Sequence, residues 1–327
     1  MTKIFDSQMN LGRNVFGPDS TIEDYLDNAH AEGVIKTIAI PTGTHELRLP
    51  SGIIERSCLW SKDYKGIVFR RILLNENGDI LEEQTNPTNP YSLMNAFCYA
   101  NISELNNKQN KIMFYFCPKL HPTLDTEDEV SKYLPLKEVV AFKIQGLSSY
   151  TTTKDVPYWL IRLLKTSHKP LMIHTDYRAK KRADGLDEIV KGNRASAWAN
   201  WAVQNNLKCY LAHGLCLDAK AIDIVNNSEL FMVGLGPDLM LNQEKNSLAI
   251  YNVDYLTFLF SKVKPEKICF NYDYRWNVLK RGEWNSLDWD SPHRIKECAI
   301  KLGRTESFLR NILFNNAMGF FNIGEEK

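Results

Sequence analysis

Eight short runs of apolar, β-branched and aromatic residues recur along the chain, with stretches of helical periodicity between them. The runs are continuously apolar, which is typical of strands in a parallel sheet that helices cover on both faces. Eight strand and helix units are the number in a (β/α)8 barrel, whereas an open doubly wound sheet more often has about six strands. We therefore predict an α/β fold, a TIM barrel forming a single domain over residues 1–327. The predicted strands are at 3–9, 34–40, 111–117, 138–144, 169–175, 207–213, 229–235 and 267–273.

Helical spacing of apolar residues predicts helices in the intervals between these strands. Polar residues that favour helix starts precede several of them, such as Ser20 or Thr21 before the first. The predicted helices are at 20–33, 90–106, 155–167, 193–206, 218–227 and 252–263.

The interval between the second and third predicted strands is too long for a simple helical connection. It holds about 70 residues, and apolar runs flank Asn77-Gly78, a strong turn signal for a two-stranded hairpin. We predict a β-hairpin insertion over about 60–90. In a barrel it would be a loop on the face where the strands end, where it either covers the pocket or serves as a purely structural flap.

Composition excludes several function classes. Lys and Arg number 40 against 39 Asp and Glu, so the chain lacks the strong basic excess of many nucleic-acid-binding domains. No apolar run approaches the roughly 20 residues of a membrane helix, and the N-terminus has no signal-peptide pattern. Seven scattered cysteines without a C-x-x-C pair fit reduced thiols. We expect a cytoplasmic protein, with a homodimer as the base-rate expectation for oligomeric state.

Polar residues at the predicted strand ends should meet in one mouth, because the carboxyl ends of barrel strands lie on the same face. Two imidazoles, a carboxylate and an amine in one mouth suit either an acid/base site or a zinc, iron or manganese site. These residues are Gln8 and Asn10 on the first strand, Lys143 on the fourth, His174 on the fifth, His213 on the sixth and Asp273 on the eighth.

The order and spacing of the local motifs resemble the amidohydrolase superfamily, in particular the amidohydrolase 2 branch, which includes decarboxylases related to the aminocarboxymuconate semialdehyde enzyme. The resemblance covers nearly the whole chain, and it implies a metal-assisted barrel enzyme. The matching motifs are FDSQMNLG, AFKIQG, LMIHTDYR, YLAHG, ICFNYDYRW and a closing ILFNNAMGFF.

The first strand departs from the family pattern. Where the family has a His-x-His pair, this chain has Gln8-Met9-Asn10, and neutral amides bind transition metals far more weakly than imidazole. Three interpretations remain. A divalent metal, zinc first, binds through His174, His213 and Asp273, with Lys143 as a further, carbamylated ligand as in some members. Alternatively no metal binds, and these side chains act on the substrate while the two amides donate hydrogen bonds to it. In the third, the site binds a ligand without turnover.

The resemblance implies roles for three residues. Asp273, the carboxylate that ends the eighth strand, would take the proton from the attacking water, and burial can raise its pKa enough for that role near neutral pH. His213 would polarise the scissile carbonyl, and His174 would hold the metal or act directly on the substrate.

Cationic side chains near the predicted mouth indicate an anionic substrate, because guanidinium groups bind carboxylates in a bidentate geometry. The candidates are Arg178, Lys180 and Arg275, with Arg70 and Arg71 on the hairpin. His121, just past the third strand, is a further candidate for substrate binding. Aromatic candidates for the apolar part of the ligand are Trp60, Tyr274 and Trp276.

We therefore expect an enzyme that hydrolyses a C–N or C–O bond of a small carboxylated metabolite. The alternatives are a metal-independent lyase or decarboxylase on the same barrel, and a non-catalytic ligand-binding barrel. Phosphate loops, serine elbows and dinucleotide fingerprints are absent from the sequence, so ATP, serine-hydrolase and NAD chemistry have no support.

Overall fold

The structure is a computed structural model. It describes residues 2–14, 22–42, 45–49, 51–57, 61–63, 66–108, 111–175, 191–236, 253–273 and 291–324.

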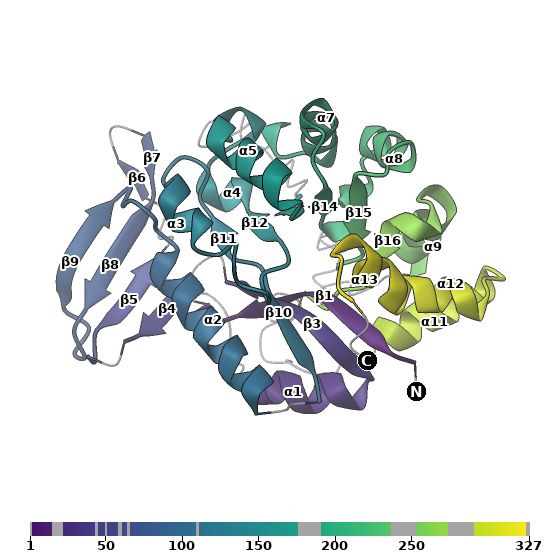
Figure 1. The fold of residues 1–327 in the computed structure, drawn as a ribbon, viewed down its shortest axis with the longest axis horizontal. Helices are drawn as coiled ribbons and strands as arrows, with labels where there is room; N and C mark the ends of the chain where they lie inside the picture. Colours follow the sequence, from purple (N-terminus) through teal and green to yellow (C-terminus); the bar gives the residue numbers. More distant parts are fainter. Residues whose placement is uncertain are drawn as a thin grey trace.

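Each of the eight predicted strand runs contains a parallel strand (Figure 1). The strand of the third run ends at Phe116, and a further short parallel strand follows after Cys117 and Pro118, beyond the predicted run. The strands are β1 (Ile4–Leu11), β3 (Val34–Pro41), β10 (Met113–Phe116), β11 (Lys119–Leu120), β12 (Phe142–Ile144), β13 (Leu171–Ile173), β14 (Cys209–Leu211), β15 (Phe231–Gly234) and β16 (Ile268–Cys269).

These strands form two parallel sheets, in the orders β1-β3-β10 and β11-β12-β13-β14-β15-β16. The sheets meet where β10 continues into β11, and a bridge joins Phe116 to Val139 beside β12. The first and last strands also meet: Ser7 N donates to the Phe270 carbonyl at 3.0 Å, and Asp273 N donates to the Gln8 carbonyl at 3.0 Å. Backbone hydrogen bonds therefore connect the two sheets at both of their edges.

Helices follow most of the parallel strands and lie around them in Figure 1. The α-helices are α1 (Ile22–Ala31), α2 (Ser92–Asn107), α3 (Glu127–Ser131), α4 (Gly146–Ser149), α5 (Tyr158–Ser167), α7 (Ala195–Asn205), α8 (Ala219–Asn226), α9 (Val253–Lys262), α11 (Ser291–Lys301), α12 (Glu306–Arg310) and α13 (Asn316–Phe320). Short 3-10 helices are η1 (Thr153–Asp155), η2 (His213–Leu217) and η4 (Pro265–Lys267), and η5 (Asn311–Asn315) is a π-helix.

Both faces of the parallel strands are buried, which explains why their sequences are continuously apolar. In β13, Leu171 and Ile173 belong to the large cluster that includes helix residues, while Met172, between them, belongs to a second cluster. That second cluster also holds Phe5, Tyr210 and the chain end around Phe321. The strands thus separate an inner core from an outer core packed with helices.

The long connection after β3 carries an antiparallel sheet, on the left of Figure 1. β8 and β9 pair across the turn at Asn75 to Asp79. The sheet is larger than the predicted hairpin: it has five strands, in the order β2-β4-β5-β8-β9. The strands of this region are β2 (Arg13–Asn14), β4 (His45–Arg48), β5 (Ile54–Ser57), β8 (Arg70–Leu74), β9 (Ile80–Thr85) and the separate pair β6 (Ser61–Asp63) and β7 (Gly66–Val68).

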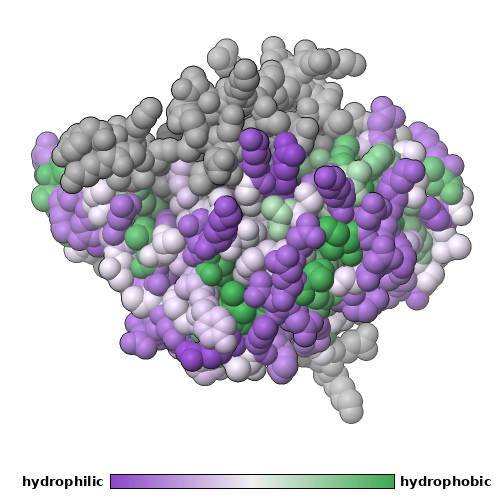
Figure 2. All heavy atoms as spheres, turned by 90° about the horizontal axis from the view of Figure 1, so that it is seen from above, coloured by the Kyte–Doolittle hydropathy of each residue, from purple (hydrophilic) through white to green (hydrophobic). Residues whose placement is uncertain are grey.

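The surface reflects the balanced charge of the chain. Figure 2 shows hydrophilic side chains interspersed with smaller hydrophobic groups on the face that it draws. Among the described residues, no helix is long and apolar enough to cross a membrane.

Candidate active site

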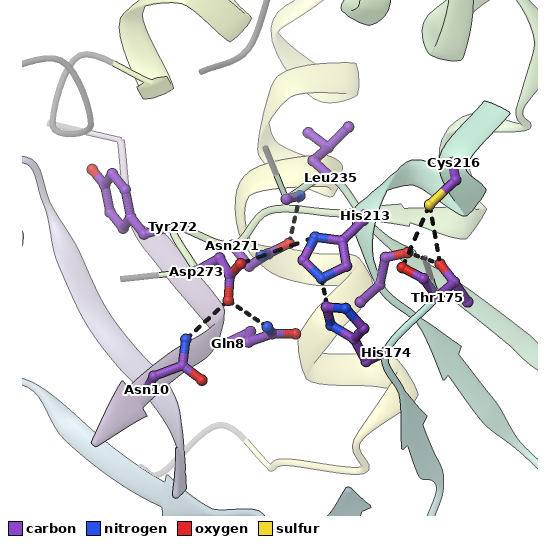
Figure 3. Close-up of polar contacts among 12 residues, drawn as sticks. Gln8, Asn10, His174, Thr175, His213, Cys216, Leu235, Asn271, Tyr272 and Asp273 are labelled. Carbon is purple, nitrogen blue, oxygen red and sulfur yellow. Dashed lines mark hydrogen bonds and ion pairs between the residues drawn. The ribbon is translucent and has the colours of Figure 1, made fainter. Parts of the chain in front are cut away.

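The ends of five parallel strands bring six predicted site residues into one region, and Figure 3 labels all of them except Lys143. They come from β1, from β12, and from the segments that follow β13, β14 and β16. Five of the six side chains are buried, and His174 is half-buried. The six are Gln8, Asn10, Lys143, His174, His213 and Asp273.

Asp273 lies at the centre of this region. Its Oδ1 accepts hydrogen bonds from Gln8 Nε2 at 2.5 Å and from Asn10 Nδ2 at 2.9 Å. The residue has a left-handed backbone conformation, with φ of 51°, and its N–H donates to the Gln8 carbonyl. The amides of Gln8 and Asn10 therefore bind and orient the carboxylate.

The two imidazoles form a pair beside Asp273. His213 Nε2 lies 2.9 Å from His174 Nδ1, and the rings meet edge to face at a centroid distance of 4.5 Å. On its other side, His213 Nδ1 is 3.9 Å from Asp273 Oδ2. The three groups thus form a row in which His213 lies between a carboxylate and a second imidazole (Figure 3).

His213 begins an unusual turn, η2, whose residues all have positive φ. Gly214 is required there, because a Cβ at this position would lie 1.9 Å from the Tyr255 hydroxyl. Cys216 Sγ donates to the Thr175 carbonyl at 3.4 Å, which ties the turn to the end of β13. Left-handed backbone costs free energy at non-glycine residues, and such strain is found most often at functional sites.

Burial shifts the pKa values of the ionisable groups towards their neutral forms. The pKa of Asp273 is raised by burial, although Lys143 and the hydrogen bond from Asn10 lower it in part. The pKa of Lys143 falls to about 8, mainly because its ammonium is buried. Lys143 Nζ donates to Gln8 Oε1 at 3.2 Å, so Gln8 connects the ammonium to the carboxylate.

Sequence reasoning missed two supporting residues, Asn271 and Asp6. Asn271 Oδ1 accepts hydrogen bonds from Gly236 N at 2.8 Å and from the Tyr210 hydroxyl at 3.1 Å. Asp6 Oδ1 accepts from the backbone N–H of Tyr272 at 2.9 Å, and burial raises its pKa to about 7. In the predicted strand at 267–273 a period of two would put Asn271 on the same face as Asp273, and that spacing was the available signal.

The candidate metal ligands converge only in part. A catalytic zinc site needs three protein donors around one point. His174 Nδ1 and His213 Nε2 face each other, but Asp273 lies beside the opposite nitrogen of His213. Within the described ranges, no group of three or more His, Cys, Asp or Glu side chains is placed to hold a metal ion. The described donors do not fit a three-ligand metal centre in this arrangement.

His121 lies in a neighbouring aromatic cluster. Its ring meets Phe69 edge to face at 5.5 Å and is 6.4 Å from the ring of Tyr91. Burial, together with the nearby Lys119 ammonium, lowers the pKa of His121 to about 4. The imidazole is therefore neutral at pH 7.

Several predicted cationic and aromatic site residues lie outside the described residues: Trp60, Arg178, Lys180, Tyr274, Arg275 and Trp276. Arg70 is described, and it forms an ion pair with Glu83 across β8 and β9 at 2.9 Å. Arg71, its neighbour on β8, is half-buried.

A cavity of about 620 Å³ lies near the opposite ends of the strands. Its lining includes Met113, which begins β10, and Val140, which precedes β12, together with Ile323 near the chain end. It is therefore separate from the residues that follow the strands.

No family model matches the chain, and no curated protein matches its sequence. Solved structures match its fold. A 4-oxalomesaconate hydratase from Rhodopseudomonas palustris superposes with a TM-score of 0.58 and 12% identity, covering 98% of this chain and 95% of that one. An amidohydrolase from Burkholderia multivorans with bound HEPES superposes with a TM-score of 0.58 and 9% identity. The match covers 98% of this chain and 100% of the amidohydrolase.

A third match is an enamidase described as a member of the amidohydrolase superfamily, with a TM-score of 0.56 and 10% identity. The match covers 98% of this chain and 67% of the enamidase. Identities this low show likeness of fold. The chain has the α/β fold of the amidohydrolase superfamily, as its sequence motifs predicted.

Proposed function

We propose that this chain is an enzyme that hydrolyses a C–N or C–O bond of a small carboxylated metabolite. The site would lie at the mouth of one closed (β/α)8 barrel domain, with the antiparallel sheet as an insertion beside the mouth. The hydrogen bonds between β1 and the residues after β16 support closure of the barrel. The buried carboxylate of Asp273 and the imidazoles of His174 and His213, which follow the strand ends, support the reaction.

One observation carries this proposal: Asp273 is a buried carboxylate whose pKa is raised and whose position two amides fix. A general base is most effective when its pKa lies near the working pH. Ionised Asp273 would remove a proton from water as the water oxygen attacks the substrate carbonyl. The amide donors hold only Oδ1, and Oδ2 is the oxygen nearest His213.

His213 would polarise the carbonyl under attack by donating a hydrogen bond from a ring nitrogen. Its pairing with His174 constrains the orientation of its ring at Nε2. The proton on Asp273 would then pass to the departing nitrogen or oxygen, which restores the carboxylate. Each proton removed from water is thereby returned to a product, and the reaction consumes one water molecule.

A metal-dependent form of this hydrolysis is the second candidate. It rests on the resemblance of the motifs, because His174 Nδ1 and His213 Nε2 are in hydrogen-bond contact with each other and Asp273 lies beside the opposite nitrogen of His213. A bound ion would supply Lewis-acid activation of water or of the carbonyl. Asp273 and Lys143 complete the ligand set predicted from the resemblance.

The experiment is a screen of purified protein against carboxylated amides, imides and lactones, with metal content measured on the same sample. We expect hydrolysis that Asp273→Asn slows by at least about 100-fold and that the exposed Asp223→Asn does not affect. Loss of activity in a chelator, restored by zinc, would select the metal-dependent form. Release of carbon dioxide, or addition of water across a double bond, would select the lyase alternative.

Full activity in Asp273→Asn would exclude the assigned base. Saturable ligand binding without turnover of any compound in the panel would favour the non-catalytic binding protein.

A further inference from the structure

The alternation of side chains along β1 breaks partway along the strand. Phe5 belongs to the inner core, and Ser7 Oγ lies 3.0 Å from the hydroxyl of Tyr210 in the same core. In a regular strand Met9 would face the inner core as well, because side chains alternate with a period of two. Met9 instead belongs to the outer core. The break therefore lies between Ser7 and Met9.

A β-bulge explains this break. Between Asp6 and Met9, β1 advances three residues while its partner strand β3 advances two. Such a bulge changes the direction of the side chains that follow it. Gln8 and Asn10 consequently point into the candidate site, where both donate to Asp273 (Figure 3). In a regular strand they would lie on the same face as Asp6.

The Asp6 carboxyl group binds the backbone at this bulge. Its Oδ1 accepts hydrogen bonds from Gln8 N at 3.2 Å and from Tyr272 N at 2.9 Å. Its Oδ2 accepts one at 2.7 Å from the hydroxyl of Tyr25, which lies on α1 in the outer core. The contact with Gln8 N is an Asx-turn, in which an aspartate binds the N–H two residues on. Asp6 is fully buried, so loss of Oδ1 would cost the two N–H groups a bond that water does not readily replace.

We infer that Asp6 is a positioning residue of the candidate active site, whose Oδ1 holds the bulge that turns Gln8 and Asn10 towards Asp273. The catalytic consequence of this inference rests on the proposed function. The same oxygen binds the N–H of Tyr272, the residue before Asp273, and Asp273 N donates to the Gln8 carbonyl at 3.0 Å. One buried oxygen thus fixes both the backbone that carries the general base and the strand that carries its two amide donors.

This role requires an acceptor at Oδ1 rather than a negative charge. Burial raises the pKa of Asp6 to about 7, although the hydrogen bond from Tyr25 lowers it in part, so the neutral form is well populated at neutral pH. With its proton on Oδ2, the carboxyl group still accepts at Oδ1. The hydroxyl of Tyr25 can then accept that proton, since it also lies 3.0 Å from Thr37 Oγ1 as a donor. Asparagine offers the same oxygen and a donor in the same places.

Asp6→Asn and Asp6→Ala are the matched variants, because both remove the charge and only the second removes the acceptor. With the compound that the screen identifies, Asp6→Ala should lower kcat about 10-fold to 100-fold and change KM less, as expected when catalytic groups are misplaced. Asp6→Asn should restore kcat to within about 3-fold of wild type. Asn106→Ala is the control: Asn106 Oδ1 accepts from Phe114 N at 3.0 Å near the opposite ends of the strands. It should lower Tm and leave kcat unchanged.

Crystal structures of the two variants test the bulge without any substrate. Asp6→Asn should keep both amides on Asp273, whereas in Asp6→Ala the strand should become regular and Gln8 should turn away from Asp273. A folded Asp6→Ala that keeps the bulge and both amide contacts would overturn the inference. If Asp6→Ala does not fold, Asp6→Ser takes its place, because a hydroxyl forms the same turn more weakly. We then expect kcat to fall at least about 3-fold, and an unchanged kcat and bulge in Asp6→Ser would overturn the inference.

The two measurements separate this inference from the proposed hydrolysis. If the bulge depends on Asp6 but no compound is hydrolysed, the role of Asp6 in placing the amides stands and the hydrolase proposal fails. If hydrolysis depends on Asp273 while Asp6→Ala keeps both kcat and the bulge, the hydrolase proposal stands and this inference fails. A loss of kcat in Asp6→Asn as large as in Asp6→Ala would assign the effect to the charge, which contradicts the acceptor role.

Discussion

The two ends of the parallel strands bury very different side chains. At the ends where the strands finish, Lys143, His213 and Asp273 are withdrawn from water, and the pKa values of Lys143 and Asp273 shift towards the neutral forms. In the inner core, Phe314 and Phe321 of the chain end pack against Phe5 of β1. The aromatic packing should stabilise the fold, whereas burial of charge should cost stability. A substitution at the strand ends should therefore lower activity without lowering stability. A substitution in the inner core should lower stability and leave the activity of the folded protein unchanged.

Asp273→Asn should have the largest effect on activity. It keeps an oxygen for the amide donors, and asparagine tolerates the left-handed backbone at this position. Loss of a general base should lower kcat by about 100-fold to 10,000-fold. The measurement is steady-state hydrolysis of the compound that the screen identifies, beside the exposed Asp223→Asn as control.

The same variant should be more stable than wild type at pH 7. A raised carboxyl pKa means that the folded state binds the proton more tightly than the unfolded state, so ionisation at neutral pH lowers the free energy of unfolding. The gain should shrink as pH falls to the ordinary carboxyl pKa. A lower Tm for Asp273→Asn at neutral pH would contradict this account.

Phe314→Ala should reverse that pattern. Phe314 is buried, and the centroid of its ring lies 6.4 Å from that of Phe5. Removing a buried phenyl ring lowers the free energy of unfolding by about 3 kcal/mol or more. The activity of the folded fraction should stay unchanged, because the ring is part of the inner core. Phe97→Ala is the matched control, since that ring is 41% exposed. A changed KM without a change in denaturant midpoint would contradict the division between the two regions.

Lys143 should define the alkaline limb of the pH profile. Activity should rise with pH as Asp273 ionises, and it should fall above about pH 8 as Lys143 loses its proton. Lys143→Met should remove the alkaline limb and raise KM for a carboxylated substrate. Lys220→Met should keep both limbs, and an alkaline limb that persists in Lys143→Met would assign it to another group.

The parallel core could be predicted from the sequence because its signal is local. Each predicted run contains a strand, since burial on both faces requires a continuous apolar segment. Polar residues next to these runs, such as His174 and Asp273, could then be assigned to one region. The short strand β11 was missed because Pro118 ends the apolar run before it.

The antiparallel sheet could be predicted only in part. The pair of β8 and β9 is joined by a tight turn that the sequence displays at Asn77-Gly78. β2 and β4 instead pair across about 30 residues, and such pairing depends on contacts that no local pattern encodes. The roles of Gln8 and Asn10 were also beyond local reasoning, because their partner, Asp273, lies more than 260 residues away.

Asn10→Ala should have the smallest effect of these substitutions, and it tests what the amides do. Asn10 Nδ2 donates to Asp273 Oδ1, which favours the ionised carboxylate, so its removal should raise the pKa of Asp273 further. The acid limb should move to higher pH while the rate on the plateau changes less, because Gln8 still donates to the same oxygen. The exposed Asn200→Ala serves as control. If Asn10 contacts the substrate instead, KM would rise and the acid limb would stay in place.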